Sequence, residues 1–339
     1  MAKKLQGQTI TLNNPPQIVN VGTIAGPEES RGPLGDNFDL VTEDPKFGQD
    51  SWEKGERKMV SEVIDLTFGK ASVSPSDIDI MLAGDLLNEI VTSNYVAKSY
   101  DIPYLGLYGA CSTLVEALGL GSLFMDGGFA DSVLAYTSSH YQTAERQFRY
   151  PLEYGVQYPA DKQYTVTGAG AYILGWMGGQ VQISHITWGK VIDYGRKDPN
   201  DMGIVMAPAA ADTILQHFDD TNREPQDYDL IVTGDLGQIG SNILNSLMQE
   251  KNIDISDRQK DCGVIIFGED SKKHGAGGSG CAASATVVGS TIIPEIISGN
   301  LSRVLVVATG VLHNPILLQQ KDTIPAIAHA IVLEKISGE

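Results

Sequence analysis

The sequence predicts an α/β fold made of two similar halves that share one core. Three observations predict it: an internal repeat, short apolar runs of strand length that alternate with amphipathic runs of helix length, and the absence of a Pro/Ser-rich linker near residues 178–186. The repeat is the strongest of the three. Residues 75–86 recur as residues 225–236 at an offset of 150, and six of the twelve positions are identical.

The first predicted element of each half is a helix that ends just before the repeat. In the first half its apolar residues recur mostly at spacings of three and four, which produces one apolar helical face. They are Trp52, Met59, Val60, Val63, Ile64 and Phe68. Ile214 and Phe218 take the places of the last two in the second half. Each repeat then predicts a Pro-containing turn, a short buried strand and a Gly-Asp-Leu exit loop.

The elements that follow also recur in the same order. A turn of small residues opens a helix, a charged turn leads to a buried strand, and an apolar strand closes the half. These turns and strands are 109–113, 132–136 and 169–174 in the first half and 278–282, 303–307 and 328–333 in the second. Because helices connect the strands, we expect parallel pairing and two central sheets around a pseudo-twofold axis. We place the halves at residues 1–180 and 181–339, within one continuous globular unit.

Composition excludes several classes of protein. With 42% hydrophobic residues the chain of 339 residues is too apolar for disorder, and a net charge of −18 argues against binding nucleic acid. Three cysteines without a Cys-x-x-Cys pair disfavour a disulfide framework and structural zinc. No metal, nucleotide or dinucleotide motif is present, so we expect no cofactor. We see no secretory signal and no apolar run of about 18 residues, and we expect an intracellular protein that does not span a membrane.

Cys111 is the sharpest candidate functional residue. Residues 102–108 predict a strand and residues 112–124 a helix, with Gly109 and Ala110 at a tight corner. This puts the thiol at a helix N-terminus, where unpaired N–H groups and the helix dipole favour the thiolate. The same arrangement presents nucleophiles in unrelated hydrolases. The residues leave two interpretations open: a nucleophile or pocket-lining thiol, and a small buried residue at a helix start.

The residues around this corner resemble the thiolase and ketoacyl-synthase superfamily. The resemblance rests on Gly-Ala-Cys-Ser-Thr at 109–113, on Thr-Gly-Ala-Gly-Ala at 167–171 before a strand, and on the duplication. Longer segments resemble, more narrowly, the stage V sporulation protein AD family of spore-forming bacteria. They are residues 83–88, 137–140, 144–151, 206–212 and 324–329, and the resemblance runs from about residue 5 to the C-terminus. It implies a thiolase-like α/β fold in αβαβα layers, with two central mixed sheets and helices between and outside them.

The resemblance also implies a function in sporulation. The family binds pyridine-2,6-dicarboxylate (dipicolinic acid), free or as its calcium chelate, and works with sister membrane proteins to move it into the developing spore. By resemblance the protein lies peripherally on the spore inner membrane or in the cytoplasm of the sporulating cell. Thiolase-like proteins commonly dimerise through the strand before the cysteine, here residues 102–108, so the resemblance implies a homodimer.

The chain departs from the catalytic members of the superfamily. Condensing enzymes supply a His and an Asn, or two His, from the second half. Carried over through the repeat, these positions fall at about 234–235 and near 278–280, and neither segment holds His or Asn. A general base and an oxyanion donor each accelerate condensation on the order of 10²–10³-fold, and without them this acceleration is lost. We therefore expect a binding protein that is not an enzyme, in which Cys111 marks a vestigial nucleophile. The alternatives are a CoA-thioester acyltransferase that uses Cys111 and a scaffold for membrane partners.

A flat aromatic dianion requires charge-assisted donors, and we expect them at strand exits, where open α/β sheets bind ligands. Arg146 and Arg149 share one face if their segment is helical, and aromatic residues between 148 and 158 can stack on a ring. The alternative for Arg146 is an ion pair with Glu145 or Glu153. The predicted ligand-contact residues are Asp85, Asn88, Cys111, Ser138, His140, Arg146, Arg149 and Gly278.

Three of these residues have a second interpretation. Asp85 can instead cap a helix N-terminus, and His140 can be a hydrogen-bonded residue of a loop. Gly278 can belong to an ordinary Gly-rich turn and not to a cradle for an anion. The remaining histidines have no companion at metal-ligand spacing, so we expect them to be packed, structural or solvated. They are His185, His217, His274, His313 and His329.

Overall fold

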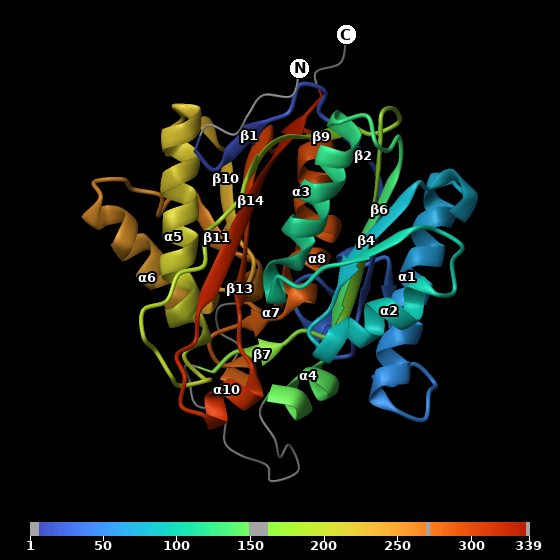
Figure 1. The fold of residues 1–339 in the computed structure, drawn as a ribbon, viewed down its shortest axis with the longest axis horizontal. Helices are drawn as coiled ribbons and strands as arrows, with labels where there is room; N and C mark the ends of the chain where they lie inside the picture. Colours follow the sequence, from blue (N-terminus) through green and yellow to red (C-terminus); the bar gives the residue numbers. More distant parts are fainter. Residues whose placement is uncertain (1–6, 149–161, 269–271, 337–339) are drawn as a thin grey trace.

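The computed structural model describes residues 7–148, 162–268 and 272–336. Helices α3 (Thr113–Asp126) and α8 (Cys281–Val287) lie in a middle layer, with a sheet on either side (Figure 1). Helix α1 (Trp52–Ala71) covers the outer face of one sheet, and α5 (Met202–Thr221) covers that of the other. The expected thiolase-like α/β architecture, with helices on both sides of mixed sheets, is confirmed.

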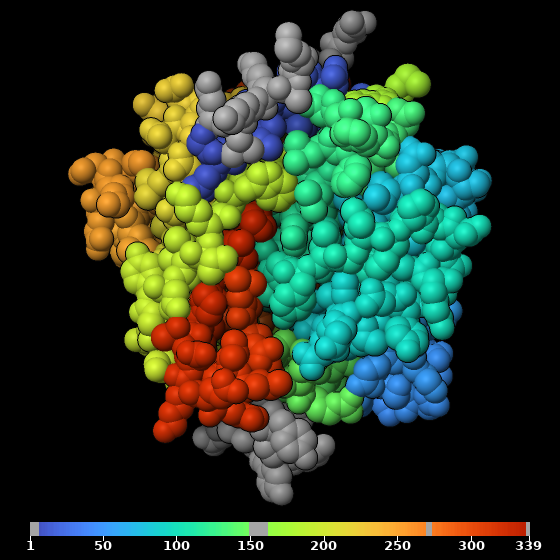
Figure 2. Space-filling view, viewed as in Figure 1, coloured from blue at the N-terminus to red at the C-terminus, as the bar shows by residue number. Residues whose placement is uncertain are grey.

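The two halves have the same strand order. The strands are β1 (Thr9–Thr11), β2 (Gln17–Ala25), β3 (Leu40–Val41), β4 (Ile80–Gly84), β5 (Tyr104–Gly106), β6 (Val133–Ser139), β7 (Tyr164–Thr165), β8 (Gly168–Gly175), β9 (Val181–Thr187), β10 (Leu230–Thr233), β11 (Gln259–Asp261), β12 (Gly278–Ser279), β13 (Arg303–Val311) and β14 (Ala326–Lys335). The first half is ordered β5-β4-β6-β8-β2 and the second β11-β10-β13-β14-β9. Hydrogen bonding between β2 and β9 joins the two sheets. In the space-filling view the first half, blue to green, packs directly against the second (Figure 2).

The other helices complete the outer layers and the connections. They are α2 (Val91–Ala97), α4 (Tyr141–Phe148), α6 (Gly237–Glu250), α7 (Cys262–Phe267), α9 (Ile293–Ser298) and α10 (Pro315–Gln319). Helices α1 and α2 lie on one side of the molecule and α5 and α6 on the opposite side (Figure 1). The middle helices are apolar almost throughout, because each is enclosed by sheets: all seven residues of α8 are buried.

The repeated aspartates have the same role in both halves. Asp77 accepts a hydrogen bond from the backbone N–H of Ser74, and Asp227 accepts one from Glu224, each at 2.8 Å. These bonds close the turn before β4 and β10. Two residues later, Asp79 and Asp229 accept backbone N–H groups from the turns that start β6 and β13. The repeat is therefore maintained by hydrogen bonds that set the spacing of neighbouring strands.

The observed strand directions agree only in part with the parallel pairing expected from the sequence. Strand β4 pairs parallel with β5 and β6, and β10 pairs parallel with β11 and β13. The strands that close each half, β8 and β14, are antiparallel to β6 and β13, so the expectation of parallel pairing is wrong there. Between β13 and β14 the reason is visible: the connection holds only the five-residue α10 and stays at one end of the sheet instead of crossing its face (Figure 1).

One apolar helical run has the dimensions of a membrane span. Residues Cys281–Ser298 have a mean hydropathy of 1.4 over 18 residues, and 67% of the run is buried inside the protein. It is the one such run among the described residues, and a single, mostly buried run is weak evidence for a membrane span. Its hydropathy is that of a helix enclosed by two sheets, and a buried core helix passes the same test of length and composition.

Glu29 is a buried carboxyl that ties the segment after β2 to the start of β8. Its Oε1 accepts the backbone N–H of Thr167 at 2.9 Å. Burial raises the pKa of Glu29 from 4.5 to about 8. The folded protein therefore keeps a proton that the unfolded chain loses above its ordinary pKa. The free energy of unfolding should fall with rising pH between about 4.5 and 8, by up to about 1.4 kcal/mol per pH unit.

We expect Glu29→Gln to remove this pH dependence, because an amide does not titrate. Urea unfolding at pH 5.5, 6.5 and 7.5 measures the effect. The stability of the variant relative to the parent should rise with pH. Glu28→Gln, at the neighbouring residue that pairs with Lys273, serves as the control. A difference between Glu29→Gln and the parent that is constant with pH would mean that Glu29 is already ionised in the folded protein.

Candidate functional site

Cys111 lies at the corner where the chain passes from β5 into α3. Residues 110–112 form a single 3-10 turn before α3 begins. Ala110 has a φ of 49°, in the left-handed region, which is strained for a residue other than glycine. The hydroxyls of Ser112 and Thr113 stabilise the turn by donating to the carbonyls of Gly109 and Ala110 at 2.6 and 2.7 Å. The turn holds the thiol facing the second half of the fold.

The carboxyl of Asp235 lies against this thiol. Asp235 follows β10 and is completely buried. It accepts hydrogen bonds from the backbone N–H of Gly280 at 3.0 Å and from the hydroxyl of Thr309 at 2.8 Å. The Cys111 thiol donates to the same carboxyl, and burial raises the pKa of Asp235 to about 7. The segment to which the repeat carries the base of condensing enzymes thus holds a hydrogen-bonded carboxyl.

Cys111 is a neutral thiol in this environment. Burial raises its pKa well above the ordinary value, and the nearby Asp235 and Cys281 raise it further. The expectation of a favoured thiolate is therefore wrong. A helix N-terminus stabilises a negative charge by about 0.3–1 kcal/mol, and by up to about 2 kcal/mol in favourable geometry. The desolvation of the thiolate beside a carboxyl outweighs this stabilisation. Because the thiolate is the nucleophilic form, covalent chemistry at Cys111 would first require the removal of the thiol proton.

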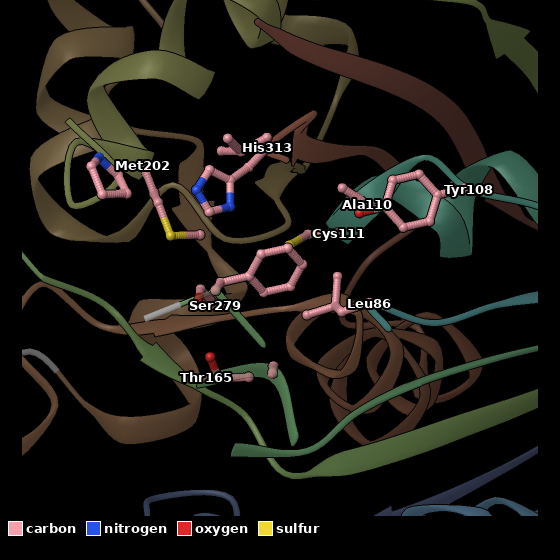
Figure 3. A pocket seen from close by; sticks show the side chains of 12 residues that line it. Leu86, Tyr108, Ala110, Cys111, Thr165, Met202, Ser279 and His313 are labelled. Carbon is pink, nitrogen blue, oxygen red and sulfur yellow. The ribbon is translucent and has the colours of Figure 1, made fainter. Parts of the chain in front are cut away.

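Cys111 lines a narrow inner cavity between the two halves. The cavity has a free volume of about 40 Å³, and most of the side chains around it are apolar or aromatic. Its lining residues are Leu86, Tyr108, Ala110, Cys111, Ala144, Phe148, Thr165, Pro199, Met202, Ser279, Val311 and His313. Figure 3 shows the side chains of Met202, His313 and Cys111 around its centre. Among the described lining residues there is no lysine or arginine.

A wider outer cavity, with a volume of about 470 Å³, adjoins the inner one. The two share the lining residues Tyr108, Phe148 and His313, and we call these three residues the neck. The outer cavity adds Leu87, Asn88, Glu89, Ile90, Leu312 and Asn314. Glu89 and Ile90 have φ values of 54° and 47°, and a positive φ at a β-branched residue is a true outlier. Backbone strain of this kind concentrates at functional sites.

Two of the predicted ligand-contact residues line these cavities: Cys111 the inner one and Asn88 the outer one. Ser138 and His140, which the sequence predicts as ligand contacts, line neither cavity. Ser138 donates to Glu56 of α1 at 2.9 Å, and the Nε2 of His140 donates to the carbonyl of Pro45 at 2.6 Å. Side chains alternate along β6, so Ser138 points toward α1 and away from the middle layer.

The remaining predicted residues also lie away from the inner cavity. Gly278 is buried in β12, and its neighbour Ser279 lines the cavity instead. Asp85 accepts the backbone N–H and the hydroxyl of Ser93 in α2, both at 2.7 Å, which confirms its interpretation as a helix cap. Arg146 lies on α4, pairs with Glu53 and lines a surface hollow that shares Leu87, Asn88 and Glu89 with the outer cavity. Arg149 lies outside the described residues.

Sequence reasoning missed four site residues: Asp235, Ser279, Met202 and His313. The first two fall within the segments at 234–235 and 278–280, which the repeat correctly placed beside Cys111. Neither residue type matches the His or Asn of condensing enzymes, so the pattern itself did not single out Asp235 or Ser279. His313 was expected to be structural or solvated, yet it follows the exit of the strand at 303–307 much as His140 follows the strand at 132–136. The same strand-exit rule, applied to the second half, points to it.

Comparisons with known proteins agree with the fold. The family model described as Stage V sporulation protein AD (SpoVAD) matches residues 6–334. Stage V sporulation protein AD of Bacillus subtilis (strain 168) is 49% identical over 336 residues, covering 99% of this chain and 99% of that protein.

Similar solved structures include two enzymes. 3-Oxoacyl-[acyl-carrier-protein] synthase III from Aquifex aeolicus VF5 has a TM-score of 0.58 at 14% identity, covering 94% of this chain and 99% of that one. Human mitochondrial 3-ketoacyl-CoA thiolase in complex with CoA has a TM-score of 0.59 at 12% identity, covering 97% of this chain and 100% of that one. At such identities the likeness shows the fold alone.

Proposed function

The chain belongs to the stage V sporulation protein AD family, and from this premise we propose that it binds dipicolinic acid, free or as its calcium chelate, in the cavities beside Cys111 and supports its uptake into the developing spore. One observation carries the proposal: a cavity lies at the Cys111 corner, while burial, with a further contribution from Asp235, raises the pKa of the thiol well above its ordinary value. A cavity retained beside an unreactive thiol is suited to binding rather than to catalysis.

The described walls suit a flat aromatic ligand. The neck is formed by the rings of Tyr108, Phe148 and His313, and the inner wall is apolar. Aromatic side chains favour stacked or edge contacts with a ring. The described lining residues include no lysine or arginine. The 1:1 calcium chelate of dipicolinate carries no net charge, so it does not require a cationic side chain. The free dianion requires a cationic partner, for which the protein offers His313 and, outside the described residues, Arg149.

Calorimetric titration of the purified protein with dipicolinate, with and without calcium, tests the proposal. We expect saturable binding of one ligand per chain. Isophthalate, which has the same two carboxylates on a benzene ring, is the matched control: it lacks the ring nitrogen that helps to hold calcium and should not gain affinity when calcium is added. No saturation with dipicolinate up to millimolar concentration would overturn the ligand assignment.

The main alternative is acyl transfer from a CoA thioester to Cys111. The thiolase-like fold is compatible with this alternative, but the raised pKa of the Cys111 thiol argues against it. Intact-mass measurement after incubation with acetyl-CoA separates the two functions. We expect no acetyl adduct on the parent. An adduct that is lost in Cys111→Ala would favour the enzyme.

In this proposal the protein works peripherally at the spore membrane with the membrane proteins of the same uptake system, and two copies pair along β5. Strand β5 is the last strand of its half of the sheet, and Leu105 exposes 43% of its surface there. An open strand edge with an exposed apolar side chain is suited to pairing with a second strand. The pairing would leave the Cys111 cavity within each copy.

A further inference from the structure

His313 is held rigidly at the neck between the two cavities. It lies in the connection between β13 and α10, and the residues on either side of it are anchored. The backbone N–H of Leu312 donates to Pro325 at 2.9 Å, and the side chain of Asn314 caps α10 by accepting from Ile316 at 2.9 Å and Leu317 at 3.2 Å. Two fixed neighbours leave the backbone of His313 little freedom.

The imidazole ring has a defined place as well. It packs against the ring of Phe148 with 5.0 Å between centroids and an angle of 46° between the planes. Figure 3 shows the ring of His313 facing the interior of the cavity, near Met202 and Cys111. Of the described residues that line either cavity, His313 is the one whose side chain can carry a positive charge.

We propose that His313, as an imidazolium, binds a carboxylate of an aromatic ligand whose ring enters the inner cavity. This inference rests on the proposed function, because it names the charged contact of the same site. An N–H donor that carries charge forms a stronger hydrogen bond to a carboxylate than a neutral donor does. The apolar inner wall strengthens the interaction by keeping water away from it.

Protonation of His313 then links ligand affinity to pH, with tighter binding at lower pH. The other ionisable groups that line the described cavities are Glu89 in the loop before α2, Tyr108 after β5, and Cys111. Asp235 lies behind the thiol. On the elements packed around the neck, Arg146 of α4 pairs with Glu53, and Asp201 before α5 pairs with Arg196. Glu89→Gln is therefore a control, because Glu89 shares the outer cavity with His313.

The test compares His313→Phe and His313→Lys with the parent. The phenylalanine keeps a ring against Phe148 without the charge, and the lysine keeps a charge at both pH values used. Calorimetry at pH 6 and pH 8 uses two probes: dipicolinate, whose carboxylates stay ionised at both values, and pyridine-2,6-dicarboxamide, which has the same ring and no charge. We expect His313→Phe to weaken dipicolinate binding at pH 6 by at least about tenfold, the scale of a lost hydrogen bond to a charged group. Binding of the diamide should not change.

The decisive measurement is the difference in dipicolinate affinity between pH 6 and pH 8. If His313 only supported the structure, its substitution would not change this difference. The parent and Glu89→Gln should bind dipicolinate more tightly at pH 6 than at pH 8, while His313→Phe and His313→Lys should lose that difference. If the parent binds dipicolinate and His313→Phe binds it equally well, the assignment of His313 is overturned and the proposed function stands. Equal losses of affinity for dipicolinate and the diamide would also overturn the assignment of His313.

If the parent binds neither probe, the proposed function fails and this inference fails with it. Should His313→Phe unfold at a lower temperature than the parent, His313→Gln replaces it.

Discussion

Ala144→Leu is expected to lower the affinity for dipicolinate by about 10- to 100-fold. Ala144 lies on α4, is 3% exposed, and packs with Leu86, Ala110 and Cys111 around the inner cavity. The leucine adds three carbon atoms to a free volume of about 40 Å³. Forcing atoms into occupied space costs about 1–3 kcal/mol, and about 1.4 kcal/mol corresponds to tenfold in affinity. The ligand has to displace this side chain in order to enter.

Calorimetry of Ala144→Leu with dipicolinate measures the effect, and thermal unfolding confirms that the variant is folded. Ala71→Leu is the matched control: it makes the same substitution at the last residue of α1, which lines neither cavity. Its affinity should equal that of the parent. Full binding by Ala144→Leu would place the ligand outside the inner cavity, with the outer cavity as the next candidate.

The duplicated fold could be predicted because its evidence lies in sequence-local patterns. The repeated aspartates at 77 and 227 and at 79 and 229 form the same backbone hydrogen bonds in both halves, so identical residues mark identical turns. The same repeat, together with the resemblance to condensing enzymes, predicts that segments 234–235 and 278–280 lie beside Cys111, where the structure has them. A repeat transfers positions between halves reliably, because each half folds by the same contacts.

The orientation of single side chains was much less predictable. Ser138 and Ser139 are neighbours on β6, but the first bonds to Glu56 and the second accepts the backbone N–H of Ala282 in the middle layer. A shift of one residue in the register exchanges the two faces, and strand boundaries read from sequence are not accurate to one residue. The direction of the pKa shift of Cys111 is not predictable from its helix position for a related reason. Its helix position is local, whereas its burial and its contact with Asp235 come from the other half of the chain.

Asp235→Asn is expected to make Cys111 more reactive toward alkylating reagents, by about tenfold for each unit by which the pKa of the thiol falls. In the parent, burial raises the pKa of Asp235 to about 7, so the carboxylate is charged mainly above that pH and opposes thiolate formation there. Asparagine keeps the shape and can still accept the N–H of Gly280, but it removes the charge. The difference between variant and parent should therefore grow as the pH rises from 6 to 8.

Iodoacetamide labelling followed by mass spectrometry measures the rate at Cys111, and Cys111→Ala in both backgrounds corrects for Cys262 and Cys281. Equal rates in parent and variant at every pH would mean that burial alone keeps the thiol neutral. A reactive thiol in Asp235→Asn that still accepts no acetyl group from acetyl-CoA would favour the binding function most strongly. It would show that the protonated sulfur is not the one feature that separates this protein from the condensing enzymes whose fold it shares. Acetylation of Asp235→Asn, in contrast, would show that this one carboxyl is what keeps an acyltransferase site silent.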